Sequence, residues 1–297
     1  MSKIMKILIL GSEGFVGNNL VEGLSKTHQV FCADLIPSSN HENYKQFDIT
    51  DPESVEKIVN DVDAVIDLAA HSLVSSLDDT IDNAKVNILG LLNVLEACRK
   101  NKIKKIIFTS ASSLVGVPTY DKVSEIHPAY PKTAYGITKL ASEHYIRLYN
   151  ELHGLTYVIF RFFNIYGPFQ KNGLIPTLYN RIVNNQPLTV FGNGNQIRDY
   201  VFIKDVVSFF ENAISSSNAD NKILNMGTGK GTTIKEIIDI LSKTVDITPE
   251  INFQSERPGE IGNFVADISQ LKSTFQKIPS TSVETGIQRT VEWFKQN

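Results

Sequence analysis

Cysteine, long apolar runs and charge of one sign are all scarce in this 297-residue sequence. Its two cysteines, Cys32 and Cys98, lie in apolar segments without disulfide or metal spacing, as expected of buried thiols in a reducing, cytoplasmic compartment. No apolar stretch approaches the roughly 20 residues that cross a bilayer. A net charge of −3 gives no general attraction to nucleic acid or anionic membranes. We therefore expect a soluble protein without metal, membrane or nucleic-acid partners, in which local positive groups bind any anionic ligand.

Short apolar runs alternate with longer amphipathic stretches in the first half of the chain. The apolar runs predict buried strands at 6–10, 29–34, 64–68, 106–110 and 157–161. The stretches between them predict helices at 18–27, 51–60, 83–100 and 134–153. Repeated strand-helix-strand units indicate an α/β fold with a doubly wound parallel sheet, whose ligands lie beyond the carboxyl ends of the strands.

The pattern becomes less regular after residue 165. Glycine turns at 173, 192–194 and 227–231 alternate with predicted helices at 205–215 and 234–244. We expect residues 1–165 to form the first domain, residues 199–226 to return to it, and residues 166–297 to form mainly a smaller α/β lobe. No linker separates the two, which predicts one unit with a cleft.

A glycine turn follows the first predicted strand and opens the first predicted helix. Gly11, Gly14 and Gly17 permit, in turn, a tight bend, a close approach of the backbone to a pyrophosphate and close helix packing. Asp34 ends the second strand, where a carboxylate accepts hydrogen bonds from the adenosine ribose and repels a 2′-phosphate. Together they predict a Rossmann-type site for NAD rather than NADP. Taken alone, the glycine turn could be an ordinary strand-helix connection, and Asp34 taken alone could be a helix cap.

Tyr135 and Lys139 stand four residues apart at the start of a predicted helix, so both side chains lie on one face. A phenol with a pKa near 10 is a poor base, but a neighbouring lysine and a cationic nicotinamide both favour the phenolate. The pair therefore predicts a proton carrier. The alternative is a surface tyrosine beside a solvated lysine.

The order of the glycine turn, Asp34, Ala69-Ala70, Asn87 and the Tyr135–Lys139 pair resembles the extended short-chain dehydrogenases/reductases. The segments 161–168, 192–201 and 257–260 are similar to the nucleotide-sugar epimerase/dehydratase branch, closest to UDP-glucose 4-epimerases. The resemblance spans nearly the whole chain.

The resemblance implies a set of contacts for NAD and for a nucleotide sugar in a substrate-binding lobe. The implied cofactor contacts, besides those above, are Phe15, Val16, Asp48, Ile49, Leu68, Ala69, Ala70, Asn87, Ser110 and Phe162, with Asp48 and Ile49 beside the adenine. The implied substrate contacts are Asn164 on the sugar diphosphate, Arg198 and Arg257 on the phosphates, and Glu260 on the nucleotide ribose. Ion pairs at the surface are the alternative for both arginines.

One position departs from the family pattern. Where relatives carry a serine or threonine that bonds the reacting sugar hydroxyl, this chain has Ala111, which has no polar side chain. Ser112 is the first candidate for that role and Ser113 the second; otherwise the tyrosine acts without a helper and the serines bond backbone groups. Related dehydratases and decarboxylases carry carboxylates at these serine positions, so their absence disfavours elimination.

The implied reaction is 4-epimerisation of a UDP-hexose through a transient 4-keto sugar, with Tyr135, Lys139 and Ser112 as the catalytic group. Phe264 favours UDP-glucose and UDP-galactose if it limits the pocket, but it could equally belong to the core. The alternatives are epimerisation of UDP-N-acetylhexosamine or UDP-glucuronate, net reduction of a nucleotide sugar, or a non-catalytic regulator that binds NAD or sugar. Helices 83–100 and 134–153 match the family's two-fold interface, which implies a homodimer.

Overall fold

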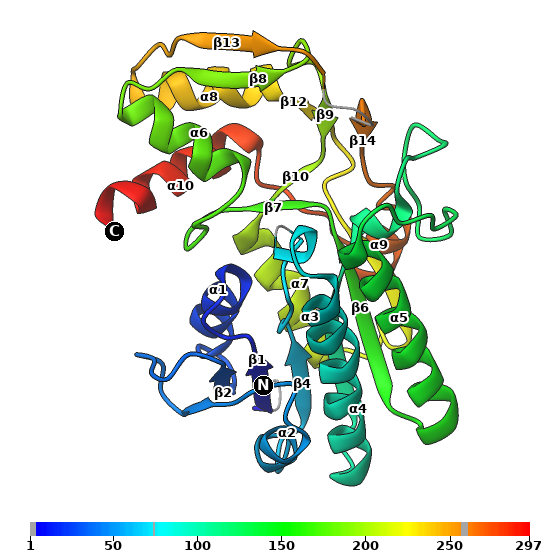
Figure 1. The fold of residues 1–297 in the computed structure, drawn as a ribbon. Coiled ribbons are helices and arrows are strands. Elements are labelled where there is room, and N and C mark those ends of the chain that lie inside the picture. The colour runs from blue at the N-terminus through cyan, green and yellow to red at the C-terminus, as the bar shows by residue number, and fades with distance from the viewer. Residues whose placement is uncertain (1–3, 74, 257–260) are drawn as a thin grey trace.

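A seven-stranded parallel sheet forms the larger lobe of the computed structural model, which describes residues 4–73, 75–256 and 261–297 (Figure 1). From one edge to the other the strands are β3 (Tyr44–Gln46), β2 (Gln29–Asp34), β1 (Lys6–Leu10), β4 (Ala64–Asp67), β5 (Lys105–Ala111), β6 (Thr156–Phe162) and β11 (Lys222–Met226). The chain runs outward from β1 in both directions, so the strand order reverses between β1 and β4. The predicted doubly wound fold is confirmed.

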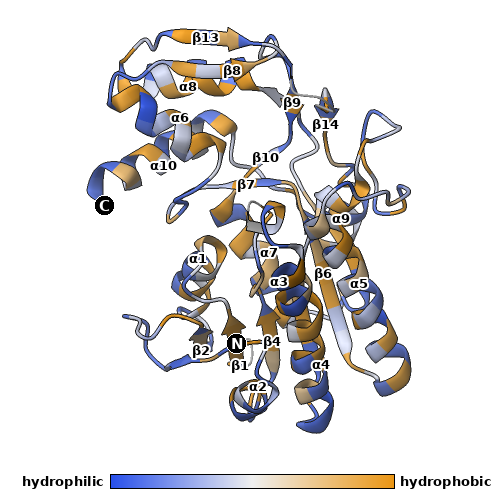
Figure 2. Ribbon diagram, in the orientation of Figure 1, coloured by the Kyte–Doolittle hydropathy of each residue, from blue (hydrophilic) through white to orange (hydrophobic). Residues whose placement is uncertain are grey.

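Alternate residues of the strands face two separate cores. In β1, Ile7 and Ile9 face a core that α1 (Phe15–Leu24) and α7 (Ile203–Ser215) cover. Leu8 and Leu10 face the other core, under α2 (Pro52–Ile58), α4 (Leu91–Lys100) and α5 (Ala134–His153). Figure 2 shows β1 and β4 as apolar strands beneath helices with polar outer surfaces. Helices on both faces explain why these strands are continuous apolar runs.

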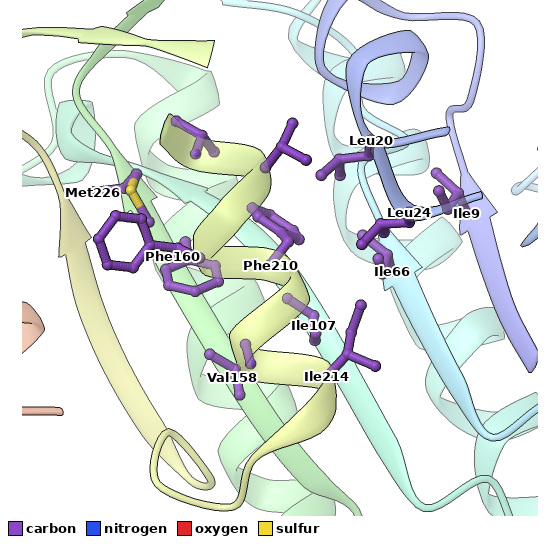
Figure 3. Close-up of a cluster of buried hydrophobic side chains, with 14 of the residues drawn as sticks. Ile9, Leu20, Leu24, Ile66, Ile107, Val158, Phe160, Phe210, Ile214 and Met226 are labelled. Atoms are coloured by element: carbon purple, nitrogen blue, oxygen red, sulfur yellow. The ribbon is translucent and has the colours of Figure 1, made fainter. Parts of the chain in front are cut away.

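Helix α7 places a later part of the chain in the first core. Figure 3 shows Phe210 of α7 between Leu20 and Leu24 of α1 and Phe160 of β6. Helix α9 (Ser269–Phe275) also contacts β11 and buries Leu271 in this core, a return that the sequence pattern did not indicate. The larger lobe is therefore built from three separate stretches of chain.

The segment predicted as one helix over 83–100 is divided. It begins as α3 (Thr80–Ala84), widens into the π-helical segment η2 (Lys85–Gly90), and continues as α4. Similarly, α1 begins at Phe15 rather than at residue 18, because the helix starts directly from the glycine turn. Short π-helical insertions are frequently found at functional sites, and η2 contains Asn87.

The smaller lobe surrounds a third core, shown at the top of Figure 1. Its helices are α6 (Leu174–Val183), α8 (Ile234–Val245) and α10 (Val283–Gln296). Its short strands are β8 (Leu188–Phe191), β9 (Ile197–Arg198), β12 (Thr232–Thr233), β13 (Ile251–Gln254) and β14 (Asn263–Phe264). The pair β7 (Asn164–Tyr166) and β10 (Tyr200–Phe202) connects the two lobes. None of the helices in the described ranges has the length and apolar character needed to span a bilayer.

Candidate active site

A cleft of about 930 Å³ is lined by both lobes. The larger lobe contributes Phe15 and Val16 from the start of α1 and Tyr135 from the start of α5. The smaller lobe contributes Arg198 of β9 and Arg181 of α6. The cleft therefore brings together the glycine turn, the predicted proton carrier and positively charged side chains, which lie far apart in the sequence.

The glycine turn is held tightly between neighbouring backbone segments. Gly11 has a φ of +81°, and a Cβ atom there would stand 2.9 Å from the Ala69 amide nitrogen. A Cβ at Gly17 would stand 2.3 Å from the Gly11 carbonyl oxygen. Gly14 caps α1 without a side chain, so the amide groups of the first helical turn face no capping group of their own. Such a helix start is suited to bind a pyrophosphate, as predicted for NAD.

Asp34 lies beside this turn with its carboxylate fixed by two backbone amides. Oδ2 accepts a hydrogen bond from the Glu13 amide at 2.9 Å, and Oδ1 accepts one from the Leu35 amide at 2.7 Å. The Glu13 carboxylate is held nearby by the Ser39 hydroxyl at 2.7 Å and lies 3.5 Å from His41. The carboxylates of Asp34 at the end of β2 and Glu13 in the glycine turn would repel a 2′-phosphate, which agrees with NAD rather than NADP.

The segments predicted to flank the adenine and the cofactor path both lie at the carboxyl ends of the parallel strands. Asp48 is exposed after β3, whereas Ile49 is buried in the second core. Leu68, Ala69 and Ala70 follow β4, and Leu68 and Ala69 pass directly beneath Gly11. The side chain of Ile49 is therefore largely committed to packing, while the other four remain candidates for cofactor contacts.

Asn87 joins the segment after β4 to helix α5. Its Oδ1 accepts from the His71 amide at 2.8 Å, while its Nδ2 donates to the His71 carbonyl at 3.2 Å and to the Thr138 hydroxyl at 3.1 Å. The side chain is buried and fully used in these bonds. Asn87 thus supports the wall of the cleft, as the resemblance implied, rather than offering a free side chain to a ligand.

Tyr135 and Lys139 are brought together as predicted. Thr133 caps α5 by accepting a hydrogen bond from the Gly136 amide at 3.1 Å, which directs the first turn of the helix into the cleft. The Lys139 ammonium donates to the Thr109 carbonyl at 2.8 Å and lies 5.6 Å from the centre of the Tyr135 ring. Lys139 is 2% exposed, so its charge acts in a medium with little water.

The protonation of this pair differs from the sequence expectation in one respect. Burial raises the pKa of Tyr135 to about 12, so the neighbouring lysine does not lower it in the protein alone. Burial lowers the pKa of Lys139 to about 8, against the opposing influence of nearby carboxylates. The phenolate therefore requires further positive charge in the cleft.

The Ser110 side chain, in a residue predicted to contact the cofactor, is bonded within the core. Its buried hydroxyl donates to Glu143 Oε1 at 2.6 Å. The same carboxylate receives bonds from Arg161 Nε at 2.9 Å and Nη2 at 2.7 Å. Only the backbone of Ser110 remains available to a cofactor, because its side chain belongs to a buried ion-pair network.

The turn after β5 contains both serine candidates for the missing hydroxyl. Ala111 ends the strand, and Ser112 begins the 3-10 segment η3 (Ser112–Val115). This segment packs against the start of α5, where the Ser113 carbonyl lies near Gly136. The Ser113 hydroxyl is buried and has no hydrogen-bond partner among the described residues. Because an unpaired buried hydroxyl is costly, Ser113 is a candidate for a ligand contact, although neither serine is among the residues that line the cleft.

The substrate side of the cleft holds Asn164 and Arg198, while Arg257 and Glu260 lie outside the described residues. Asn164 Nδ2 donates to the Asp199 carbonyl at 3.2 Å, and Arg198 Nη1 donates to the Ile197 carbonyl at 2.9 Å. Buried Asp199 accepts bonds from the amides of Thr228 and Gly229 at 2.8 and 2.9 Å. Asp199 thus fixes the strand that presents Arg198.

Two phenylalanines predicted to face the ligands occupy different environments in the structure. Phe162, predicted to contact the cofactor, lines the cleft. Phe264 is 7% exposed and packs on Phe163, with ring centres 5.4 Å apart, within a small core. The packing therefore supports a core position for Phe264, which gives no preference for a particular sugar.

Sequence reasoning missed three charged groups around the cleft. Glu13 lies inside the glycine motif, Arg181 faces the cleft from α6, and Asp67 is buried at the end of β4. A signal existed only for Asp67, which interrupts an otherwise apolar strand. Glu13 and Arg181 look like ordinary surface charges until the fold places them.

A sequence model described as the NAD dependent epimerase/dehydratase family matches residues 7–227. This range includes the glycine turn, the Tyr135–Lys139 pair and Arg198. A Methanocaldococcus jannaschii protein provisionally named UDP-glucose 4-epimerase is 35% identical over 305 residues, covering 98% of this chain and 99% of its own. The similarity therefore extends over both lobes.

Solved structures with the same fold differ in the sugar that they bind. The Thermotoga maritima UDP-glucose 4-epimerase, solved with UDP-glucose, matches with a TM-score of 0.91 at 30% identity, covering 98% of this chain and 99% of its own. The Methanobrevibacter ruminantium UDP-N-acetylglucosamine 4-epimerase, in complex with UDP-N-acetylmuramic acid, matches with a TM-score of 0.91 at 30% identity and covers 99% of both chains. Similarity of this degree does not distinguish one hexose from another.

Proposed function

Because the chain belongs to the NAD-dependent epimerase/dehydratase family, we propose that it is a UDP-hexose 4-epimerase of the UDP-glucose/UDP-galactose type. The observation that supports this most is the position of Tyr135, which opens into the same cleft as the glycine turn and Arg198. A nucleotide sugar whose phosphates bind Arg198 would then present its hexose to the tyrosine.

The cofactor site is suited to NAD on the chemistry of its residues. The start of α1 offers backbone amides to the pyrophosphate, and Asp34 offers a carboxylate to the adenosine ribose. Bound NAD supplies a hydride acceptor and donor for carbon 4 of the sugar and is regenerated within each turnover. Lys139 would hold the nicotinamide ribose.

Tyr135 is proposed to take the proton from the sugar 4-hydroxyl while a hydride leaves carbon 4, and to return the proton to the 4-oxygen when the hydride is added back to the opposite face of that carbon. Burial raises the pKa of the phenol, which keeps Tyr135 protonated between transfers and makes its phenolate a strong base. The ammonium of Lys139 and the positive charge of the bound cofactor would stabilise the phenolate needed to remove the proton. Anchoring by Arg198 leaves the hexose free to turn between the two proton transfers.

Elimination is disfavoured because the turn after β5 carries Ser112 and Ser113 in place of carboxylates. Epimerisation of UDP-N-acetylhexosamine or UDP-glucuronate is the nearest alternative, since Phe264 lies in a core and no longer argues against a larger sugar. Net reduction of a nucleotide sugar would use the same groups but would release the cofactor after each turnover.

Purified protein incubated with UDP-glucose, UDP-galactose, their N-acetyl forms and UDP-glucuronate will identify the substrate. We expect the 4-epimer of UDP-glucose and UDP-galactose in the NMR spectrum, without added cofactor and without net formation of NADH. A net reductase would instead consume NADH in equal amount to product. Absence of any 4-epimer would contradict the proposal.

Replacing Ser113 by Ala is expected to lower kcat by about tenfold to a hundredfold, the usual cost of losing one hydrogen bond to a reacting oxygen. The folded protein should be no less stable, because the hydroxyl has no partner to lose. Ser112→Ala provides the matched control on the same turn. A larger loss in Ser112→Ala would restore Ser112 as the catalytic hydroxyl, and no loss in either would leave Tyr135 without a helper.

We also propose a homodimer formed through α5 and the preceding helices. Leu148 and Leu152 of α5, and Leu89 of η2, are large apolar side chains at the surface, with Leu152 65% exposed. Exposed apolar stripes of this kind are typical of interfaces between copies.

We expect the double variant Leu148→Glu with Leu152→Glu to be a monomer, so that its mass in solution falls from about twice 33.1 kDa to that of one chain when measured by light scattering. Ile278→Glu, at another exposed apolar position, should leave the dimer intact; a wild-type monomer would contradict the proposal.

A further inference from the structure

Asp67 is a buried carboxylate for which the proposed reaction has so far no use. It ends β4, is 1% exposed, and lies among strand residues that are all buried. Oδ1 accepts a hydrogen bond from the Ala69 amide at 3.1 Å, whereas Oδ2 has no hydrogen-bond partner among the described residues. A half-satisfied buried carboxylate destabilises a protein unless a nearby charge compensates it.

The compensating charge is Lys139. Asp67 and Phe108 are neighbours in register in the parallel strands β4 and β5, so their side chains lie on the same face of the sheet. The Lys139 ammonium lies 4.5 Å from the centre of the Phe108 ring on that face. It is held there by the carbonyl of Thr109, the next residue along β5. The carboxylate and the ammonium are therefore both buried on the same face of the sheet, where the charge of each acts on the other.

The pKa shifts of the two groups agree with this placement. Burial raises the pKa of Asp67 to about 6, and the charge of Lys139 opposes that rise. Burial lowers the pKa of Lys139 to about 8, and the charge of Asp67 is the stronger of the two that oppose the fall. Each group thus favours the ionised form of the other.

The other charged and titratable groups around the pair do not replace Asp67. Glu143 of α5 also faces Lys139, but its carboxylate is bonded twice by Arg161 of β6 and once by Ser110. Burial raises the pKa of Cys98 of α4, so this thiol is neutral. Tyr135 is a neutral phenol at ordinary pH, because burial raises its pKa as well. Asp67 is therefore the negative charge near Lys139 that no arginine neutralises.

We propose that Asp67 is a positioning residue that keeps Lys139 in its ammonium form, so that Tyr135 has a cation beside it during proton transfer. This inference rests on the proposed function, in which the ammonium favours the tyrosine phenolate. Asp67 of β4 would then influence catalysis through Lys139 without touching the substrate. This role would explain why a strand of the core ends in an acidic residue.

Replacing Asp67 by Asn removes the charge and keeps an oxygen for the Ala69 amide. We expect Lys139 to lose its proton at lower pH, so the alkaline limb of the kcat/KM profile of the holoenzyme should move down by about one pH unit, a loss of about fivefold at pH 8 that approaches tenfold at higher pH. Asp63→Asn, just before the start of the same strand, is the matched control and should leave the profile unchanged. An equal loss at every pH, or no change, would overturn the proposal.

A second measurement does not depend on the reaction or on the folding of that variant. The carboxyl carbon of Asp67 can be titrated by NMR in isotope-labelled wild-type holoenzyme and in Lys139→Met. If the two groups interact, loss of the ammonium should raise the pKa of Asp67 by about one unit or more, because coupling between two sites is reciprocal. Lys105→Met, whose ammonium pairs with Asp220, should leave it unchanged. An unchanged titration in Lys139→Met would overturn the proposal even if epimerisation is observed, and a raised pKa would support it even if no epimer forms.

Discussion

Replacing Tyr135 by Phe is expected to lower kcat by about three orders of magnitude, within the range seen when a general acid–base group is lost. The substitution removes only the phenolic oxygen. The ring and its position beside the Lys139 ammonium, 5.6 Å from the ring centre, remain. Among the described residues, the Tyr135 hydroxyl does not support the wall of the cleft by a hydrogen bond. Its removal should therefore leave the shape of the cleft unchanged.

The measurement combines turnover with cofactor content. Formation of the 4-epimer is followed by NMR, and bound NAD is quantified after denaturation of the purified protein. We expect wild-type NAD content with almost no turnover. Tyr130→Phe, at a tyrosine that is 69% exposed, makes the same chemical change outside the cleft and should retain full activity. Activity above about a tenth of wild type in Tyr135→Phe would remove the tyrosine from the reaction.

This result would also separate an enzyme from a regulator of the same fold. A non-catalytic protein would need the glycine turn and Asp34 to bind NAD, but it would have no turnover for Tyr135→Phe to abolish. The cleft brings the tyrosine, the glycine turn and Arg198 together, which a sensor of NAD alone would not require.

Five of the seven strands of the large sheet could be predicted closely because burial on both faces leaves a simple pattern, whereas the edge strands β3 and β11 were not predicted. The predicted strand at 6–10 matches β1, and that at 29–34 matches β2. Helix starts were less accurate where no side chain caps the helix, as at Gly14 before α1. Helix geometry changes at η2, where Asn87 bonds to His71 and Thr138, contacts between distant residues that a local pattern cannot contain.

The candidate site was predictable where chemistry and spacing coincide within a few residues. The Tyr135–Lys139 pair lies on one turn of helix, and Gly11, Gly14 and Gly17 lie on one bend. The side-chain partner of Ser110 could not be predicted, because Glu143 lies 33 residues away. Phe264 likewise packs on Phe163, which no spacing rule connects to it. Contacts between distant segments decide which polar or aromatic residue faces the cleft.

Replacing Gly17 by Ala is expected to destabilise the larger lobe and to remove NAD from the protein. The new Cβ would stand 2.3 Å from the Gly11 carbonyl oxygen and 2.5 Å from the Ser12 carbonyl oxygen. Both atoms belong to backbone that cannot yield easily, because the amides of Gly11 and Ser12 donate to the Ala33 carbonyl at 2.8 and 3.2 Å. Overpacking against fixed atoms costs about 2 kcal/mol or more, which corresponds to roughly 4 °C or more in the unfolding midpoint.

Gly14→Ala separates the pyrophosphate contact from the folding of the turn. A Cβ at Gly14 would meet only the Gly11 carbonyl oxygen, at an ordinary contact distance of 3.4 Å, and Gly14 has a φ of −71° that alanine adopts readily. The NAD-free variant should therefore unfold within about 2 °C of wild type. Its added methyl group would nevertheless stand at the start of α1, where the backbone is proposed to approach the pyrophosphate, so NAD affinity should fall at least about tenfold, or 1.4 kcal/mol, by calorimetry. Wild-type affinity in Gly14→Ala would place the pyrophosphate elsewhere, and a wild-type midpoint in Gly17→Ala would show that the turn can open to admit a methyl group.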